Sequence, residues 1–293
     1  MHILVLLLSL MISCGEDEPS KTNIVKGELL KSNNSPVVAL QKKSYNNEWF
    51  TFCTGTLISK QHVLTAAHCS EHKEKIYNTE DLRVLVACTK TNSNGIKAIN
   101  VSKVSQSPNF DRTAMTTRNS DGIIEPDNAG DIAIWTLAEA SNLEPAQILN
   151  NKVQQNPLQD GATIEVWGFG KKHQWDTGNN TSASLAKAEL VFSDLSELSV
   201  KKQVYENGRH YKKKITLVFS SIGKSEFYLG GPGQPDTCGG DSGGPAFLKN
   251  AEHPFTVIGI TSRGESTCER GGVYTFAPVY YDWVQGIIQG TDI

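Results

Sequence analysis

The chain has no excess of positive charge. Among its 293 residues, 28 Lys and Arg are outnumbered by 31 Asp and Glu, so the formal net charge is −3 and the pI is about 6.2. Proteins that bind nucleic acid need a basic surface, and we therefore expect no nucleic-acid partner. A short basic run at residues 212–214 is interpreted as a solvated loop or strand edge.

A long apolar run and a cluster of metal-ligating carboxylates are also missing. Residues 3–12 are apolar, but this run is too short to span a bilayer. No group of Asp and Glu residues has the spacing of a calcium loop, so we predict no metal site and no cofactor. The 38% of hydrophobic residues suffices for a sizeable core, which excludes a disordered chain.

The amino terminus has the features of an export signal. Residues 1–13 contain the short apolar run and are followed by Cys14 and by acidic residues 16–18. Residues 11–14 (MISC) resemble the lipobox of bacterial lipoproteins, whose cysteine is lipidated, and an ordinary cleaved signal is the alternative. We expect an exported protein that is secreted, periplasmic or anchored to the cell envelope through a lipidated Cys14, with residues 14–23 as a tether or propeptide.

The remaining sequence is dominated by short alternating or β-branched runs, which is an all-β pattern. Near the carboxyl end, apolar residues at three- and four-residue steps predict a closing helix over about residues 279–289. Stretches rich in Asn, Thr and Ser are interpreted as long surface loops at residues 112–128 and 176–184. The clearest strands are expected at residues 37–40, 55–58, 82–86, 132–135, 163–167, 215–219 and 256–260.

Residues 236–245 (DTCGGDSGGP) have the composition of a nucleophile loop. Ser242 is framed by glycines, which allow a sharp turn and bring backbone N–H groups close to a reacting carbonyl. A serine hydroxyl needs a base, and His68 within residues 65–69 (TAAHC) is the candidate. A third member has to fix the histidine tautomer, and we assign Asp131, at the head of an apolar strand, to that position.

These motifs occur in an order that resembles the trypsin type of chymotrypsin-fold serine protease, from about Ile24 to Gln289. The order of His68, Asp131 and Ser242 argues against an esterase or lipase, in which the serine comes first. The motifs that carry the resemblance are residues 24–27 (IVKG), 53–58 (CTGTLI), 65–69, 131–134 (DIAI), 167–170 (WGFG), 236–245 and 271–275 (GGVYT).

The resemblance implies two six-stranded antiparallel barrels within residues 24–290, the first over about 24–150 and the second over about 151–278. It implies that Ser242 attacks the scissile carbonyl, that His68 transfers the proton and that Asp131 orients His68. Backbone N–H groups of Gly240 and Ser242 are expected to form the oxyanion hole, and Ser262 to donate a hydrogen bond to Asp131. A catalytically silent binding module with the same fold is the alternative.

The substrate pocket is also implied by the resemblance. Asp236 falls at the base of the primary specificity pocket, and a buried carboxylate there favours Arg or Lys before the cleaved bond. Gly264 and Gly272 match the pocket walls and leave the slot open. Arg263 stands where the family usually has tryptophan, so we expect more polar neighbouring subsites. The expected partners are protein or peptide substrates and a proteinaceous inhibitor, and the chain is expected to be a monomer.

Activation and cysteine pairing follow from the same resemblance. A new α-amino group at Ile24 is expected to pair with Asp241, but Asn23 precedes Ile24, so an Arg- or Lys-specific enzyme would not cut this bond itself. Another protease matures the chain, or trimming starts from Lys21, or an anchored form stays a zymogen. The disulfides are expected to join Cys53 to Cys69 and Cys238 to Cys268, and Cys88 is interpreted as a buried, unreactive thiol. The intervals between the triad members imply insertions, the first of them at residues 112–128 beside the cleft.

Overall fold

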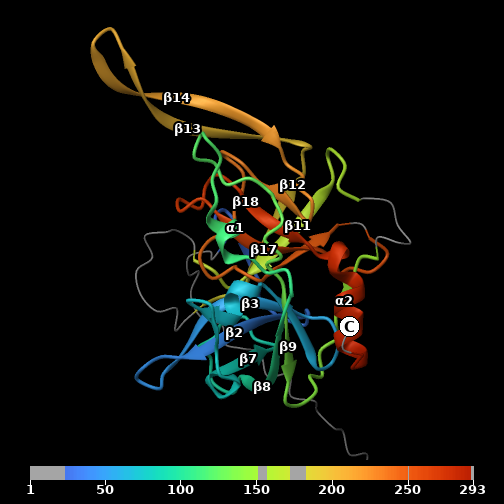
Figure 1. Ribbon diagram of the computed structural model, residues 1–293. Helices are drawn as coiled ribbons and strands as arrows, with labels where there is room; N and C mark the ends of the chain where they lie inside the picture. Colours follow the sequence, from blue (N-terminus) through green and yellow to red (C-terminus); the bar gives the residue numbers. More distant parts are fainter. Residues whose placement is uncertain (1–23, 151–156, 172–182, 250, 292–293) are drawn as a thin grey trace, which may run out of the picture.

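The computed structural model describes residues 24–150, 157–171, 183–249 and 251–291 (Figure 1). Most of the regular structure is β-strand, as the alternating sequence pattern predicts. The export signal, the tether and Cys14 lie outside the described residues, and so does most of the loop expected at residues 176–184. Among the described residues, no helix combines the length and the apolar character that crossing a bilayer requires.

Six antiparallel strands in the first half close into a barrel. Strand β4 (His62–Thr65) pairs with β9 (Ala133–Leu137) in a register that sets Thr65 opposite Ala133. This pairing brings the segment after β4 close to the segment before β9. Side chains such as Val38, Leu64 and Trp135 are buried in the core that these strands form. Around the barrel the strands are β2 (Val37–Lys43), β3 (Trp49–Leu57), β4 (His62–Thr65), β9 (Ala133–Leu137), β8 (Lys97–Gln106) and β7 (Leu82–Val86).

The second half forms an eight-stranded sheet rather than a second closed six-stranded barrel. The sheet stays open, because its edge strands β1 (Glu28–Leu29) and β15 (Glu226–Leu229) do not pair within the described residues. The chain between β12 (Ala186–Val191) and β15 forms a separate hairpin instead of adding a strand to this sheet. The sheet order is β1 (Glu28–Leu29), β12 (Ala186–Val191), β11 (Thr163–Gly168), β16 (Pro245–Leu248), β17 (Thr256–Gly264), β18 (Gly272–Phe276) and β15 (Glu226–Leu229), and β10 (Gln147–Ile148) pairs with β17 in parallel. Two segments that we placed in the first barrel, β1 and β10, thus pair with the second sheet instead.

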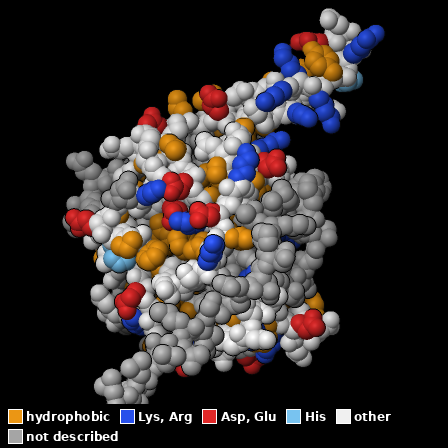
Figure 2. All heavy atoms as spheres, turned by 180° about the vertical axis from the view of Figure 1, so that it is seen from behind, with side chains coloured by type: hydrophobic (Ala, Val, Ile, Leu, Met, Phe, Trp, Pro, Cys, Tyr) orange, Lys and Arg blue, Asp and Glu red, His pale blue; other side chains and the backbone are white. Residues whose placement is uncertain are grey.

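The separate hairpin consists of β13 (Leu195–Glu206) and β14 (Arg209–Ser220). It projects from the body as a two-stranded ribbon (Figure 1), and Figure 2 shows Lys and Arg side chains gathered along it. The expected strand at residues 215–219 is part of β14, but the sequence pattern did not reveal its long partner. The ribbon forms the insertion between Asp131 and Ser242.

The described residues also form two short α-helices. The closing helix α2 (Tyr281–Gln289) follows a 3-10 turn, η3 (Ala277–Tyr280), and packs Val284 and Trp283 against the first core. It ends at Gly290, whose left-handed backbone is readily adopted by glycine. The segment at residues 112–128 begins with α1 (Arg112–Thr116), capped by the Asp111 carboxylate. It is more than a surface loop, because Ile123 and Ile124 within it are buried.

The remaining elements are short. A 3-10 turn, η1 (Ala67–Ser70), follows β4, and another, η2 (Thr79–Asp81), precedes β7. Between them β5 (Glu71–His72) and β6 (Lys75–Ile76) form a small two-stranded sheet. Turn η1 matters for the site because it carries His68.

Candidate active site

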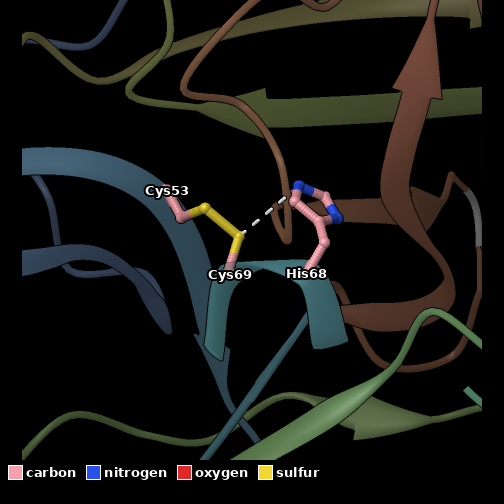
Figure 3. Close-up of side chains that lie close together, drawn as sticks. All are labelled: Cys53, His68 and Cys69. Atoms are coloured by element: carbon pink, nitrogen blue, oxygen red, sulfur yellow. Dashed lines mark hydrogen bonds between the residues drawn. A yellow bond between two sulfur atoms is a disulfide. The ribbon is translucent and has the colours of Figure 1, made fainter. Parts of the chain in front are cut away.

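His68 lies in η1 beside a disulfide that fastens this turn to the barrel. Cys69 is joined to Cys53 on β3, and one ring nitrogen of His68, Nε2, lies 3.8 Å from the Cys69 sulfur (Figure 3). Three such residues in one place would suit a metal ion by residue type. Both sulfurs are held in the disulfide, however, and a disulfide sulfur is not the thiolate that binds metal, so we assign no metal to this cluster.

Asp131 lies two residues before β9 and faces His68. The His68 ring nitrogen Nδ1 is 2.8 Å from the Asp131 oxygen Oδ2, and the backbone N–H of His68 donates to the other oxygen at 2.9 Å. The pairing of β4 with β9 produces this contact. His68 follows the end of β4, Asp131 precedes the start of β9, and these two strand ends are paired. The two hydrogen bonds fix the position of the ring relative to the carboxylate.

The Asp131 carboxylate is fully buried and is supplied with donors from the second sheet. Ser262 on β17 donates to Oδ2 at 2.6 Å, and Thr275 on β18 donates to the Asp131 backbone carbonyl at 3.0 Å. Burial alone would raise the pKa of Asp131, but the contact with His68 and the hydrogen bonds from His68 and Ser262 outweigh it and lower the pKa. The carboxylate therefore stays ionised at neutral pH beside the imidazole.

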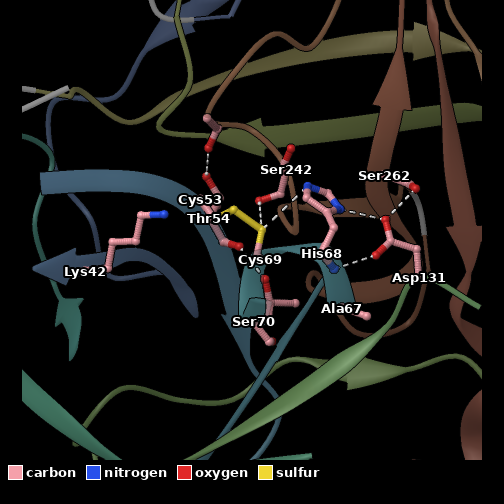
Figure 4. The surroundings of a disulfide bond; sticks show 12 residues. Lys42, Cys53, Thr54, Ala67, His68, Cys69, Ser70, Asp131, Ser242 and Ser262 are labelled. Carbon is pink, nitrogen blue, oxygen red and sulfur yellow. Dashed lines mark hydrogen bonds and ion pairs between the residues drawn. A yellow bond between two sulfur atoms is a disulfide. The ribbon is translucent and has the colours of Figure 1, made fainter. Parts of the chain in front are cut away.

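Ser242 comes from the second half of the chain and lies on the other side of the His68 ring from Asp131 (Figure 4). Thr54 on β3 links the halves: its N–H donates to the Ser242 carbonyl at 2.8 Å, and its hydroxyl donates to the Gly240 carbonyl at 3.0 Å. The sequence analysis missed Thr54, because a threonine in a strand carries no signal of such a contact. The nucleophile loop is thus fixed directly to the barrel that carries His68.

The backbone around Ser242 leaves two N–H groups unengaged. Among the described residues, neither the Gly240 N–H nor the Ser242 N–H donates to a protein acceptor. Gly240 has φ 104°, and a Cβ there would lie 2.9 Å from the Gly170 Cα, so only glycine fits this turn without strain. Neither N–H is used within the described residues, so both are available to an oxygen of a reacting carbonyl.

Asp236 is buried below the nucleophile loop. Its Oδ2 accepts the N–H groups of Arg270 at 3.1 Å and Gly271 at 2.9 Å, and burial raises its pKa to about 6. A hollow of about 350 Å³ beside it is lined by Ser242 and by both arms of the disulfide between Cys238 and Cys268. Gly264 also lines the hollow and pairs with Gly272 across β17 and β18. Asp236 itself is not in contact with this space.

Ile24 and Asp241 are both fully buried. Asp241 accepts the N–H groups of Gly170 at 2.7 Å and Cys238 at 2.8 Å, and burial raises its pKa to about 7. Val25 forms a short antiparallel bridge with Asp236, which places the start of the described chain next to Asp236. Asn23 lies outside the described residues.

Arg263 lines the same hollow as Ser242, but its charge is paired within the protein. Its guanidinium lies 2.7 Å from each carboxylate oxygen of Glu226 on β15, and both side chains are buried. The sequence analysis noticed Arg263 but not its partner, because the two lie far apart in the chain. Cys88 is buried, as expected.

Comparison with known proteins identifies one family and many curated relatives. The model of the trypsin family matches residues 24–284. A CLIP domain-containing serine protease B9 of Anopheles gambiae is 29% identical over 265 residues, which cover 85% of this chain and 59% of the relative. The chain thus spans about three fifths of the length of that relative. An insect relative lends no support to the bacterial lipoprotein origin that residues 11–14 suggested.

The matched region begins at Ile24 and ends inside α2, so it contains both halves of the fold together with His68, Asp131 and Ser242. A match over most of the chain shows common descent rather than a shared motif. The chain therefore belongs to the trypsin family of chymotrypsin-fold serine proteases.

Proposed function

We propose that the chain is a serine endopeptidase that hydrolyses peptide bonds after Arg or Lys. The observation that carries this proposal is the contact of the His68 ring with the buried, ionised Asp131 on one side while Ser242 lies on its other side. A silent binding module has no need of this arrangement, so the geometry favours catalysis over binding alone.

The reaction proceeds through an acyl-enzyme. His68 removes the proton of the Ser242 hydroxyl as the oxygen attacks the scissile carbonyl, and it then donates that proton to the leaving amine. Asp131 holds the ring and stabilises the imidazolium that forms. The developing oxyanion accepts the N–H groups of Gly240 and Ser242, and losing one such donor typically costs about 3 kcal/mol of transition-state stabilisation. Water then attacks the ester carbonyl. His68 removes a proton from this water and donates it to the Ser242 oxygen as the acyl group leaves.

Asp236 is proposed to select the substrate, although its carboxylate does not line the hollow beside Ser242 in the uncut chain. A carboxylate that is buried and held by two backbone N–H groups needs a cation to complete its pairing, and the side chain of Arg or Lys supplies one. An apolar side chain in the same slot would leave the carboxylate desolvated without a partner. Gly264 and Gly272 keep the walls of the slot free of side chains.

Activation requires a new amino terminus at Ile24. Its ammonium group pairs with the Asp241 carboxylate, whose raised pKa in the uncleaved chain reflects a buried charge without a cation. Because Asn23 precedes Ile24, the cut is made by a protease of other specificity, or after trimming from Lys21. Two disulfides favour an exported enzyme. We propose protein substrates and a protein inhibitor as its partners.

Peptide substrates test the proposal once Ile24 has been released by a site-specific protease whose recognition sequence ends at residue 23. Tetrapeptide amides ending in Arg, Lys, Phe or Leu are compared, with Ser242→Ala as the inactive control. The proposal expects Arg and Lys substrates to be cleaved at least a hundredfold faster. A preference for Phe or Leu would contradict the role of Asp236, and absence of cleavage with all four would favour the silent module.

A further inference from the structure

The projecting hairpin carries like charges directly opposite one another. In the pairing of β13 with β14, Lys201 lies opposite Lys214 and Lys202 lies opposite Lys213. Like charges in directly opposed positions destabilise a sheet, and a two-stranded ribbon has little other support. A ribbon that retains two such pairs in succession is therefore suited to bind an anionic partner.

The two faces of the ribbon differ in their charge balance. Side chains alternate between faces, so Lys201, Lys212 and Lys214 share one face, which we call the tether face, while Lys202 and Lys213 lie on the other. Lys202 forms an ion pair with Asp121 at 2.8 Å. Among the described residues, the three exposed lysines of the tether face have no ion-pair partner. The uncompensated charge is thus concentrated on this face.

The tether face lies beside the amino-terminal end of the described chain. Ser199, two residues before Lys201 and on the same face, borders a surface hollow together with Val25 and Lys26. Lys26 is held there by a hydrogen bond from its Nζ to the Gly233 carbonyl at 2.8 Å. The segment that precedes Ile24 therefore starts near the base of the hairpin.

We propose that the acidic run Glu16, Asp17 and Glu18 docks on the tether face before the chain is cut at Ile24. Three consecutive acids meet three uncompensated lysines, and the segment that holds them begins beside the same face. Charged pairs at an exposed surface are individually weak, so the docking is reversible and sensitive to salt. The tether then shields the residues that precede the activation cut.

The chain is long enough for this contact. An extended chain spans up to about 3.4 Å per residue, so the segment from Ile24 back to Glu18 reaches up to roughly 20 Å. Along the ribbon, Lys201 and Lys214 lie about 7 Å beyond Ser199, and Lys212 about 13 Å beyond it. The proposal goes beyond the proposed function, and it is tested on an inactive chain so that its failure is distinguishable from failure of the catalytic assignment.

The test measures hydrogen exchange of residues 14–23 in the uncut exported chain with Ser242→Ala. The variant K201Q/K214Q removes one opposed lysine pair from the tether face. The variant K202Q/K213Q is the matched control, because it removes the neighbouring opposed pair from the other face. We expect about tenfold faster exchange of the tether in K201Q/K214Q and in E16Q/D17N/E18Q, and no change in the control.

A second measurement uses charge reversal. K201E/K214E is expected to release the tether, and adding E16K/D17K/E18K is expected to restore its protection, while 1 M salt removes protection in the parent chain. Equal exchange in the parent and in K201Q/K214Q overturns the proposal. Equal exchange is expected if an acidic partner protein is the true occupant of the tether face. It is also expected if the lysines serve only to prevent the ribbon edges from pairing with another strand.

Discussion

Arg263 and Glu226 form a two-point ion pair next to Ser262, which donates a hydrogen bond to Asp131. The Nη1 and Nη2 atoms of Arg263 each lie 2.7 Å from one carboxylate oxygen of Glu226. The pair also holds the insertion at residues 112–128, since Arg263 donates to the Glu125 carbonyl at 3.2 Å and Glu226 accepts the N–H of Asp127 at 2.8 Å. Arg263, which lines the hollow beside Ser242, thus also anchors this insertion.

Breaking this pair is expected to destabilise the fold. In Glu226→Gln the buried guanidinium loses its counter-charge, which typically costs about 3–5 kcal/mol. Urea unfolding of the inactive Ser242→Ala chain measures the loss. Glu144→Gln serves as the control, because the pair of Lys60 with Glu144 is exposed and worth under about 1 kcal/mol. Equal small losses in both variants would show that the Arg263 pair does not anchor the loop.

The catalytic residues were predictable from the sequence because their motifs are local. Ser242 and His68 each lie in a short run whose residue types are dictated by the turn and its chemistry. The structure brings these residues together at the site, but their roles remain proposals. The strand ranges at residues 82–86 and 163–167 were also correct, because apolar and β-branched residues dominate these two runs.

The hairpin and the open second sheet could not be predicted in the same way. β13 and β14 expose polar side chains on both faces, so alternation between apolar and polar residues, the usual signal of a strand, is weak. Contacts such as Thr54 with Gly240 depend on which strands meet, and no local pattern encodes them. Single-sequence reasoning therefore found the chemistry and missed the connections that hold it.

Ser262 is expected to act through Asp131. Ser262→Ala removes the 2.6 Å hydrogen bond to the carboxylate, and a hydrogen bond to a charged group contributes about 1.5–3 kcal/mol, so kcat/KM should fall by at least about tenfold with little change in KM. Ser59→Ala is the matched control, since it removes a serine 2.7 Å from His62, a histidine outside the site. Equal activity in the two variants would contradict the role of Ser262.

The preference for Arg over Phe is expected to depend on pH. The pKa of Asp236 is raised to about 6 by burial, so the carboxyl group is mostly neutral below that pH and no longer favours a cation. The ratio of kcat/KM for Arg and Phe substrates should fall as pH drops from 7 to 5. Protonation of the triad affects both substrates alike and cancels in the ratio. In Asp236→Asn the ratio should stay constant. A ratio that is also constant in the parent enzyme would argue against the assignment of Asp236 to the substrate pocket.

Asp241 is expected to make the uncut chain less stable as pH rises. Its folded pKa of about 7 lies above the unfolded value near 3.9, so the folded state binds the extra proton between these pH values. The stabilisation is complete below about pH 4 and is lost as pH rises through 7. The Tm difference between the Ser242→Ala chain and its Asp241→Asn variant should therefore change across this window. After cleavage, the Ile24 ammonium pairs with Asp241 and this pH dependence should disappear. Identical pH profiles before and after cleavage would mean that the two groups do not meet.

The central claim is that Ser242 becomes a reactive nucleophile once Ile24 is a free amino terminus. Covalent labelling by a fluorophosphonate, measured by mass spectrometry before and after cleavage at residue 23, tests it most directly. The account predicts rapid labelling of Ser242 after cleavage, at least a hundredfold slower labelling before it, and none in His68→Ala. Equal labelling of the cut and uncut chains would contradict the activation by Ile24, and no labelling of either would contradict the catalytic assignment itself.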